Sequence, residues 1–152
     1  MMFVALFFAY AVVRVRLDAW PGPTLSHLPR ALPLFNTGVI AASSLALFRS
    51  SRAVSPDRWV LAALVLGVAF LGLQVSLWSQ LSASGIHLRE GTLPGIVYGL
   101  TALHGAHLLV GVLGLAAVLA TGVKRSSLEL WSAYWHFVGV VWVAVLVFVF
   151  LI

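Results

Sequence analysis

Residues 93–121 form a long apolar run, LPGIVYGLTALHGAHLLVGVLGLAAVLAT. It contains no Asp, Glu, Lys or Arg over its whole length, and about 20 mostly apolar residues are enough for a helix to cross a bilayer. Short polar or basic segments separate it from further apolar stretches at residues 1–17, 33–48, 59–81 and 128–152. The sequence therefore predicts an all-α, polytopic transmembrane helix bundle with five membrane-spanning helices in a single domain, residues 1–152.

The composition fits a chain that is solvated by lipid rather than by water. Hydrophobic residues make up 62% and charged residues 9%, and the mean hydropathy is +1.07, whereas a soluble domain is roughly 45–50% apolar and about 25% charged. The formal net charge is +5, but no basic face is interleaved with aromatic residues. We therefore expect the basic residues to meet lipid headgroups, and we expect no nucleic-acid partner. Cysteine is absent, which excludes disulfides, thiolate metal sites and cysteine catalysis.

The distribution of basic residues predicts an orientation. With five spans, segments 49–58 and 122–128 share one side of the membrane and carry five of the nine basic residues, and the other four lie on the opposite side. Short loops rich in Lys and Arg tend to stay in the cytoplasm. We therefore expect the N-terminus in the cytoplasm and the C-terminus outside. We also expect an integral membrane protein, with a bacterial plasma membrane as its location.

Several polar side chains fall inside the predicted spans, where each is costly and calls for a partner. His104 and His107 lie three residues apart, and Gly111 and Gly114 continue the same helical face, where small residues let another helix approach closely. Glu129 shares a face of the last span with Ser132 and His136. We predict a structural, interhelical polar network made of Asn36, Gln74, His104, His107, Glu129, Tyr134 and His136.

Chemical alternatives remain open for these residues. A haem with two histidine ligands could take His104 or His107 together with His136, whereas a catalytic metal needs about three protein ligands. Glu129 is either a proton-relay group or a carboxylate near a helix start, stabilised by the helix dipole and a neighbouring basic residue. The sequence contains no nucleotide-binding loop and no nucleophile elbow. With four acidic residues in the whole chain, paired-carboxylate catalysis is not expected either, and we expect no catalytic residue.

Four segments, taken in order, resemble a known family. Residues 129–142, ELWSAYWHFVGVVW, are similar to the last helix of subunit III of haem–copper terminal oxidases of the cytochrome c oxidase type, in which a Glu precedes Tyr-Trp-His-Phe-Val-Asp-Val-Val-Trp at this spacing. Residues 100–111 (LTALHGAHLLVG) and 33–44 (PLFNTGVIAASS) resemble further family segments, and residues 67–78 match more weakly. The resemblance covers essentially the whole chain.

The chain also departs from the family pattern. Family members usually have seven helices, and the first span here resembles the third of them, so the resemblance implies a short five-helix form without the first two. Gly139 stands where the family usually has Asp, and Leu77 stands where a Glu often occurs. A family carboxylate just before the Met2-Phe3 pair is absent as well. These differences weaken a role for this chain in relaying protons through carboxylates.

The resemblance implies a non-catalytic membrane subunit of a proton-pumping oxidase in aerobic respiratory electron transport. Partner subunits would bind the haems and the copper, and this chain would bind neither. Its main partner would be subunit I, with subunit II and further respiratory-complex subunits beside it. It would support stability, lipid contact (including phospholipid) and proton uptake in a complex with cytochrome-c oxidase activity. The alternatives are a subunit III-like partner of a quinol oxidase or nitric oxide reductase, a stand-alone haem-binding membrane protein, and a small transporter.

Overall fold

The fold is a bundle of antiparallel helices, seen in a computed structural model that describes residues 8, 11–12, 15, 31–83 and 92–151. The elements are α2 (Ala31–Ser50), α3 (Pro56–Ala83), α4 (Thr92–Ala120), α5 (Arg125–Val145) and the π-helical turn η1 (Leu146–Leu151). These ranges contain no strand. Within them, four helices are long and apolar enough to cross a membrane. The predicted all-α membrane fold is confirmed.

Four of the five predicted spans are present, so the predicted count of five is not matched. The first predicted span, residues 1–17, lies outside the described residues except at positions 8, 11, 12 and 15. The helices predicted at 33–48 and 59–81 are longer than predicted at both ends. Polar residues such as Arg49 and Asp57 stay helical there, because a helix satisfies its own backbone groups and need not end where the apolar run ends. The last helix begins at Arg125 rather than at residue 128, and its end is π-helical.

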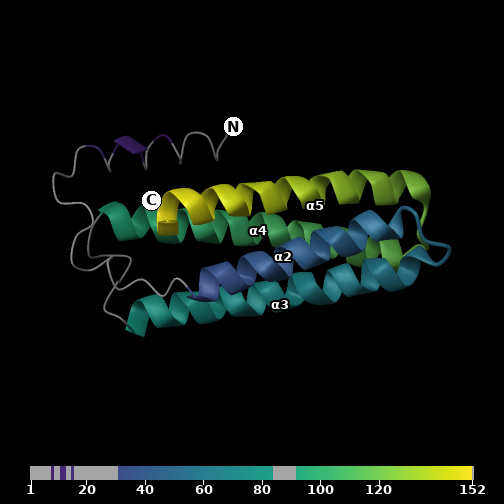
Figure 1. The fold of residues 1–152 in the computed structure, drawn as a ribbon, viewed down its shortest axis with the longest axis horizontal. Helices are drawn as coiled ribbons and strands as arrows, with labels where there is room; N and C mark the ends of the chain where they lie inside the picture. Colours follow the sequence, from purple (N-terminus) through teal and green to yellow (C-terminus); the bar gives the residue numbers. More distant parts are fainter. Residues whose placement is uncertain (1–7, 9–10, 13–14, 16–30, 84–91, 152) are drawn as a thin grey trace.

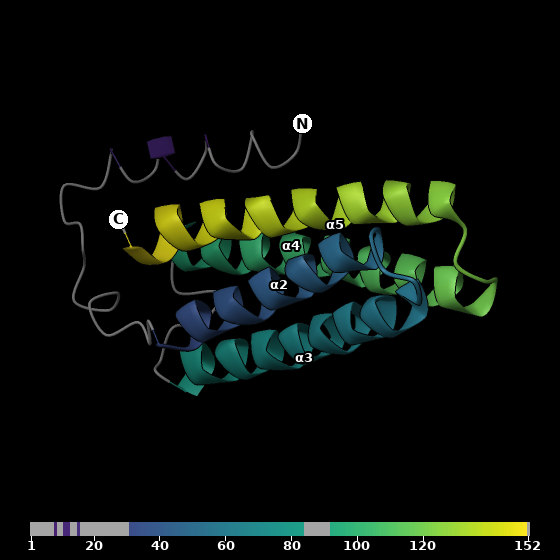
Figure 2. The ribbon, with the colours of Figure 1, turned by 45° about the vertical axis from the view of Figure 1, so that its right-hand side comes forward.

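The four helices form a ring in which each helix packs on two neighbours: α2 on α3, α3 on α4, α4 on α5, and α5 on α2. Both short connections, residues 51–55 and 121–124, lie at the same end of the bundle, so consecutive helices run antiparallel (Figure 1 and Figure 2). Pro56 opens α3, a position where a missing backbone N–H is harmless. Gly122 takes a positive φ of 85° in the second connection, a conformation that glycine adopts without strain.

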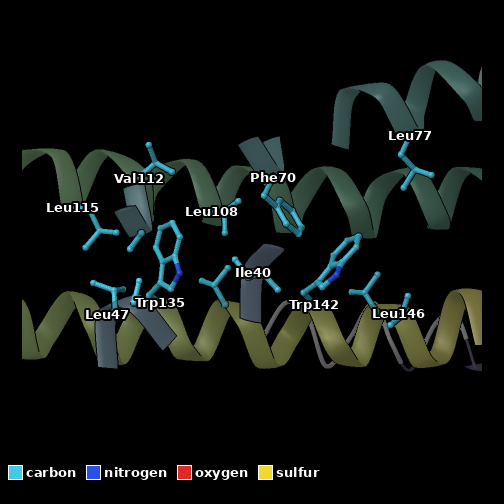
Figure 3. Close-up of a cluster of buried hydrophobic side chains, with 14 of the residues drawn as sticks. Ile40, Leu47, Phe70, Leu77, Leu108, Val112, Leu115, Trp135, Trp142 and Leu146 are labelled. Carbon is cyan, nitrogen blue, oxygen red and sulfur yellow. The ribbon is translucent and has the colours of Figure 1, made fainter. Parts of the chain in front are cut away.

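The bundle is apolar on its outer surface as well as in its core. Leu47, Phe70 and Leu108 are buried between the helices (Figure 3), while outward-facing side chains such as Val65 and Leu113 are exposed. Only 33–44% of the residues in each spanning stretch are buried. A helix that is apolar on every side belongs either in the core of a large protein or in a membrane. In a chain of this size, the exposed apolar faces are suited to lipid or to other membrane helices.

Glycines let a tryptophan occupy the centre of the bundle. The ring of Trp135 on α5 packs on Gly67 of α3 and on Gly111 of α4. A methyl group added at Gly67 would lie 2.9 Å from its Cζ2 atom and closer still to Cη2, and one added at Gly111 would lie 3.0 Å from Cε3. Gly114 meets the ring of Trp131 in the same manner. Small residues at such positions are what allow membrane helices to approach each other closely.

We expect Gly67→Ala to destabilise the bundle, because the Trp135 ring would have to move to make room for the added methyl group. The cost should be about 1–3 kcal/mol, as for other insertions into a filled core. Gly72→Ala on the same helix is the matched control, since no atom lies within 4 Å of a methyl group added there, and alanine favours the helix. The thermal unfolding midpoint in mild detergent distinguishes the two variants. Equal midpoints would contradict a tight contact at Gly67.

Candidate functional site

The centre of the bundle holds an imidazole against two aromatic rings. His104 of α4 is fully buried. Its ring centre lies 5.1 Å from that of Trp142 on α5 and 5.7 Å from that of Phe70 on α3. Phe70 and Trp142 also contact each other edge to face, with 4.9 Å between ring centres (Figure 3). Aromatic pairs of this kind contribute about 0.5–1.5 kcal/mol beyond the area they bury. The cluster therefore ties α3, α4 and α5 together.

Two hydrogen bonds between tryptophan and threonine join further helix pairs. Trp142 Nε1 of α5 donates to Thr37 Oγ1 of α2, and Trp78 Nε1 of α3 donates to Thr101 Oγ1 of α4, both over 3.0 Å. Each threonine hydroxyl in turn donates, over 2.8 Å, to the carbonyl oxygen four residues earlier on its own helix. Each indole N–H thus has an acceptor, and each hydroxyl both accepts and donates. This leaves none of these polar groups unpaired inside the bundle.

Backbone carbonyls also accept side-chain hydrogen bonds across helix interfaces. The Tyr134 hydroxyl of α5 donates to the carbonyl oxygen of His107 on α4 over 2.9 Å. The hydroxyl of Ser43 on α2 donates to the carbonyl oxygen of Ala63 on α3, also over 2.9 Å. The His107 imidazole lies along its own helix, with Nδ1 2.7 Å from the carbonyl oxygen of Leu103. Of the predicted network residues, Tyr134 therefore forms a hydrogen bond between helices, and its acceptor is the backbone carbonyl of His107 rather than the imidazole.

Three of the predicted network residues lie in the core with unpaired side chains. Asn36 of α2, Gln74 of α3 and His104 of α4 are at most 1% exposed. None of their side-chain nitrogen and oxygen atoms has a hydrogen-bond partner among the residues that the structure describes, and the same holds for Trp135 Nε1. Because buried polar atoms in proteins are normally paired, these residues stand apart from the satisfied hydroxyls and indoles around them.

The other two predicted network residues lie nearer the surface. Glu129 is exposed and forms an ion pair with Arg125 on the preceding turn, with 3.1 Å between Oε1 and Nε. It lies outside the bundle interior, because its place near the start of α5 puts it at the end of the bundle; an exposed pair of this kind contributes little to stability. His136 is half-buried, and its Nε2 lies 3.3 Å from Ser132 Oγ on the same helix.

An open groove runs between α2 and α5 at His136. It has a volume of about 250 Å³ and a mainly apolar lining that includes Ala41, Ser44, Gly139 and Val140. Three of the lining residues, Ala41, Ser44 and Gly139, have small side chains or none, which leaves room between the two helices there. His136 thus belongs to this outer groove, whereas His104 belongs to the core.

The described residues provide no group of three or more His, Asp or Glu side chains that could hold a metal ion. The three histidines considered for haem have different surroundings. The ring of His104 is flanked by Phe70 and Trp142, His107 lies against its own helix at Leu103, and His136 lines the groove toward α2. The residues that the structure brings together bind helices to one another.

Thr37, Thr101 and Ser43 take part in this packing and were not among the predicted network residues. A hydroxyl residue inside a helix commonly bonds to a carbonyl of the preceding turn, which the sequence alone does indicate. The second bond, to an indole or a carbonyl of another helix, depends on which faces meet. Neighbouring residues in the sequence do not indicate this second bond, because Trp142 and Thr37 are 105 positions apart.

The Trp142–Thr37 bond can be tested by a double-mutant cycle. Thr37→Val keeps the shape of the side chain and removes the acceptor, and Trp142→Phe removes the donor. We expect each single variant to have a lower free energy of unfolding. The loss in the double variant should be smaller than the sum of the two single losses. The difference should be about 0.6 kcal/mol and at most about 1.7 kcal/mol, as for other hydrogen bonds between membrane helices. The measurement is the free energy of unfolding in denaturing detergent.

Trp142→Phe combined with Thr101→Val is the matched control, since Thr101 bonds to the other tryptophan. The losses of this pair should add, as they do for residues without shared partners. Additive losses in the Trp142–Thr37 cycle as well would mean that this bond does not contribute.

The sequence is similar to known proteins along its whole length. The family model for cytochrome c oxidase subunit III matches residues 1–152. The cytochrome c oxidase subunit 3 of Thermostichus vulcanus is 28% identical over 94% of this chain and 76% of that protein. The cytochrome bo(3) ubiquinol oxidase subunit 3 of Pseudomonas aeruginosa is 25% identical over 99% of this chain and 78% of that protein. The probable cytochrome c oxidase subunit 3 of Mycobacterium leprae is 28% identical over 100% of this chain and 81% of that protein.

The motif segments coincide with the contacts that build the bundle. Trp135 and Trp142 of residues 129–142 fill the core from α5, and residues 100–111 supply Thr101, His104 and Gly111 from α4. The matching segments are thus spread over all four described helices and follow the same order along the chain. The chain belongs to the cytochrome c oxidase subunit III family and is a subunit III of a haem–copper oxidase.

Proposed function

We propose that this chain is a non-catalytic subunit of a proton-pumping terminal oxidase, in which it packs on subunit I and supports stability, contact with lipid, including phospholipid, and proton uptake. The observation that carries the proposal is that several polar side chains form bonds between helices, as in the Trp142–Thr37 and Tyr134–His107 bonds. In this proposal the haems and the copper belong to partner subunits. Subunit II and further respiratory-complex subunits are additional contacts.

The electron donor of the complex has two candidates. One relative is named as a cytochrome c oxidase subunit and another as a ubiquinol oxidase subunit, and both align with more than nine-tenths of this chain at similar identity. We take cytochrome c as the first candidate, because the matching family is that of cytochrome c oxidase. Quinol is the second candidate, supported by the relative from Pseudomonas aeruginosa.

The proposal includes a fifth membrane helix formed by residues 1–17. The sequence MMFVALFFAYAVV is apolar throughout, and the two arginines that follow could extend toward the headgroups and lengthen the span. A helix here would bring the N-terminus to the side of the membrane that holds the connections 51–55 and 121–124. With both arginines extended toward the headgroups, residues 1–17 reach the lower end of the range for a membrane-spanning helix, about 17–25 residues.

The same end of the bundle is proposed to be cytoplasmic. Its described basic residues outnumber its acidic ones, and they are Arg49, Arg52, Arg58, Lys124 and Arg125. Two of them cover aromatic rings, Arg49 over Trp59 at 5.5 Å and Arg52 over Phe48 at 4.5 Å. Basic and aromatic side chains together are typical of the membrane–water interface, and an excess of Lys and Arg favours the cytoplasmic side.

Affinity capture of this chain from native membranes in mild detergent tests the proposed role. We expect a larger haem-bearing chain to be captured with it, together with oxygen reduction driven by reduced cytochrome c or by quinol. The two donors, offered separately to the same preparation, distinguish the two oxidase types. Capture of this chain alone, with haem absorbance of its own, would overturn the proposal in favour of a stand-alone haem protein.

A strain that lacks this chain provides the companion measurement. The oxidase from that strain should keep its haem spectrum, since no ligand is removed, but it should lose activity sooner during continuous turnover. A changed haem spectrum in an otherwise assembled oxidase would contradict a purely supporting role.

The absence of cysteine makes the orientation simple to test with single introduced cysteines and a membrane-impermeant maleimide. Val54→Cys lies in the first connection, where Val54 is fully exposed, and Ala83→Cys lies at the opposite end of α3. We expect Ala83→Cys to be labelled in intact cells and Val54→Cys only after permeabilisation. Met2→Cys should behave like Val54→Cys if residues 1–17 span the membrane. Labelling that matches Ala83→Cys would refute the fifth helix.

A further inference from the structure

Three buried polar side chains from three different helices have no hydrogen bond to one another or to the described residues around them. Asn36 comes from α2, Gln74 from α3 and His104 from α4, and together they are called the polar layer here. All three are at most 1% exposed. Their six side-chain nitrogen and oxygen atoms have no hydrogen-bond partner within the described part of the chain. They are therefore a set of strong donors and acceptors with nothing to bond to in the surrounding apolar core.

Known contacts establish that Asn36 and His104 lie at the same level. Ser43 of α2 bonds to Ala63 of α3, and these two helices are antiparallel. Moving two turns, or seven residues, back along α2 and the same distance forward along α3 brings Asn36 opposite Phe70. Phe70 in turn contacts the ring of His104 on α4. Asn36 and His104 therefore lie on either side of one turn of α3.

Gln74 lies at this level as well, on the face of α3 that packs on α4. It is one turn after Phe70, which contacts His104, and one turn before Trp78, which donates to Thr101. His104 and Thr101 are themselves one turn apart on α4. Both neighbours of Gln74 on this face of α3 thus touch α4, so Gln74 faces α4 beside His104.

The walls of the polar layer are aromatic and aliphatic. Phe70 and Trp142 flank His104, and Leu77 and Leu108 are fully buried close by in sequence on α3 and α4. The one hydrogen-bonding group of Trp142 is already used, since Nε1 donates to Thr37. No charged residue lies in the core among the described residues, so an ion would have no counter-charge there. A ligand for the layer must be small, neutral, and able both to donate and to accept hydrogen bonds.

We propose that the polar layer is a binding site for internal water, which bridges Asn36, Gln74 and His104 and so links α2, α3 and α4. Each amide offers donors and an acceptor, and a neutral imidazole offers one of each. Water matches this set, because it donates and accepts at once and typically makes about three bonds when buried. Polar groups that face one another beyond direct bonding distance are commonly joined by such a molecule.

The layer lies closer to one end of the bundle than to the other. Gln74 is nine residues from the end of α3 at Ala83, which corresponds to roughly 14 Å along a helix. Asn36 is five residues from the start of α2 at Ala31. Both distances lead to the same end of the bundle, where α3 ends and α2 begins (Figure 1). The site is therefore nearer to one membrane surface than to the other.

A cryo-electron microscopy map of the intact complex in a lipid nanodisc, at a resolution that shows ordered water, tests the proposal. It does not depend on which partners accompany the chain. We expect density peaks about 2.7–3.2 Å from polar atoms of at least two members of the layer. Direct hydrogen bonds among the three side chains, or side chains without any peak between them, would overturn the proposal.

Gln74→Met supplies the matching variant, because it keeps the length of the side chain and removes the amide. The peak next to position 74 should disappear from the map of the assembled complex. Gln80→Met, an exposed position on the same helix, is the control and should leave the peaks in place. Unchanged peaks in Gln74→Met would show that other groups hold the water and would refute the site. If Gln74→Met fails to assemble, the map of the unaltered complex decides the question.

Discussion

Inside a bilayer a polar group cannot bond to bulk water, and the architecture of this chain follows from that constraint. Backbone groups are satisfied by making every spanning segment a helix. Hydroxyl side chains are satisfied in the same local way: Thr37, Ser76 and Thr121 each donate to the carbonyl oxygen four residues earlier. Only a few polar groups are left for contacts between helices, and these few determine which faces meet.

Close contact between glycines and tryptophans supplies the second part of the architecture. Apolar burial does not favour one helix face over another when lipid is as apolar as the core, so packing has to come from shape. Trp135 fits against Gly67 and Gly111, and the indole is too large for that space if either glycine gains a side chain. The tryptophan on α5 therefore needs glycines on two other helices at matching heights. This requirement fixes the height of α5 relative to α3 and α4.

The existence of the four described helices could be predicted from the sequence, because each apolar run is long enough to span the membrane. The sequence does not predict which face of each helix points into the bundle. Leu47 is fully buried while its neighbour Phe48 is exposed, and both are equally apolar, so periodicity gives no signal. The family resemblance helped more, since its motifs contain Tyr134, Trp135 and His104. It gave no partners for them. For Glu129 the ion pair with Arg125, one helical turn earlier, agrees with the predicted carboxylate near a helix start beside a basic residue, and its exposure gives no support to a place in an interior network.

Gly139, where the chain departs from the family pattern, differs from Gly67 and Gly111, which pack against Trp135. A side chain at Gly67 or Gly111 would collide with Trp135, whereas a Cβ at Gly139 would lie 3.5 Å from Ser44 Oγ, an ordinary contact distance. Packing therefore leaves room for a Cβ at this position, unlike at Gly67 and Gly111. A carboxylate here would lie in the groove that Ser44 and His136 line, where a hydroxyl and an imidazole are available as partners.

With glycine at position 139, the groove between α2 and α5 is open and mainly apolar. Gly139 thus lines the outer α2–α5 groove, whereas Gly67 and Gly111 hold the core tryptophan Trp135.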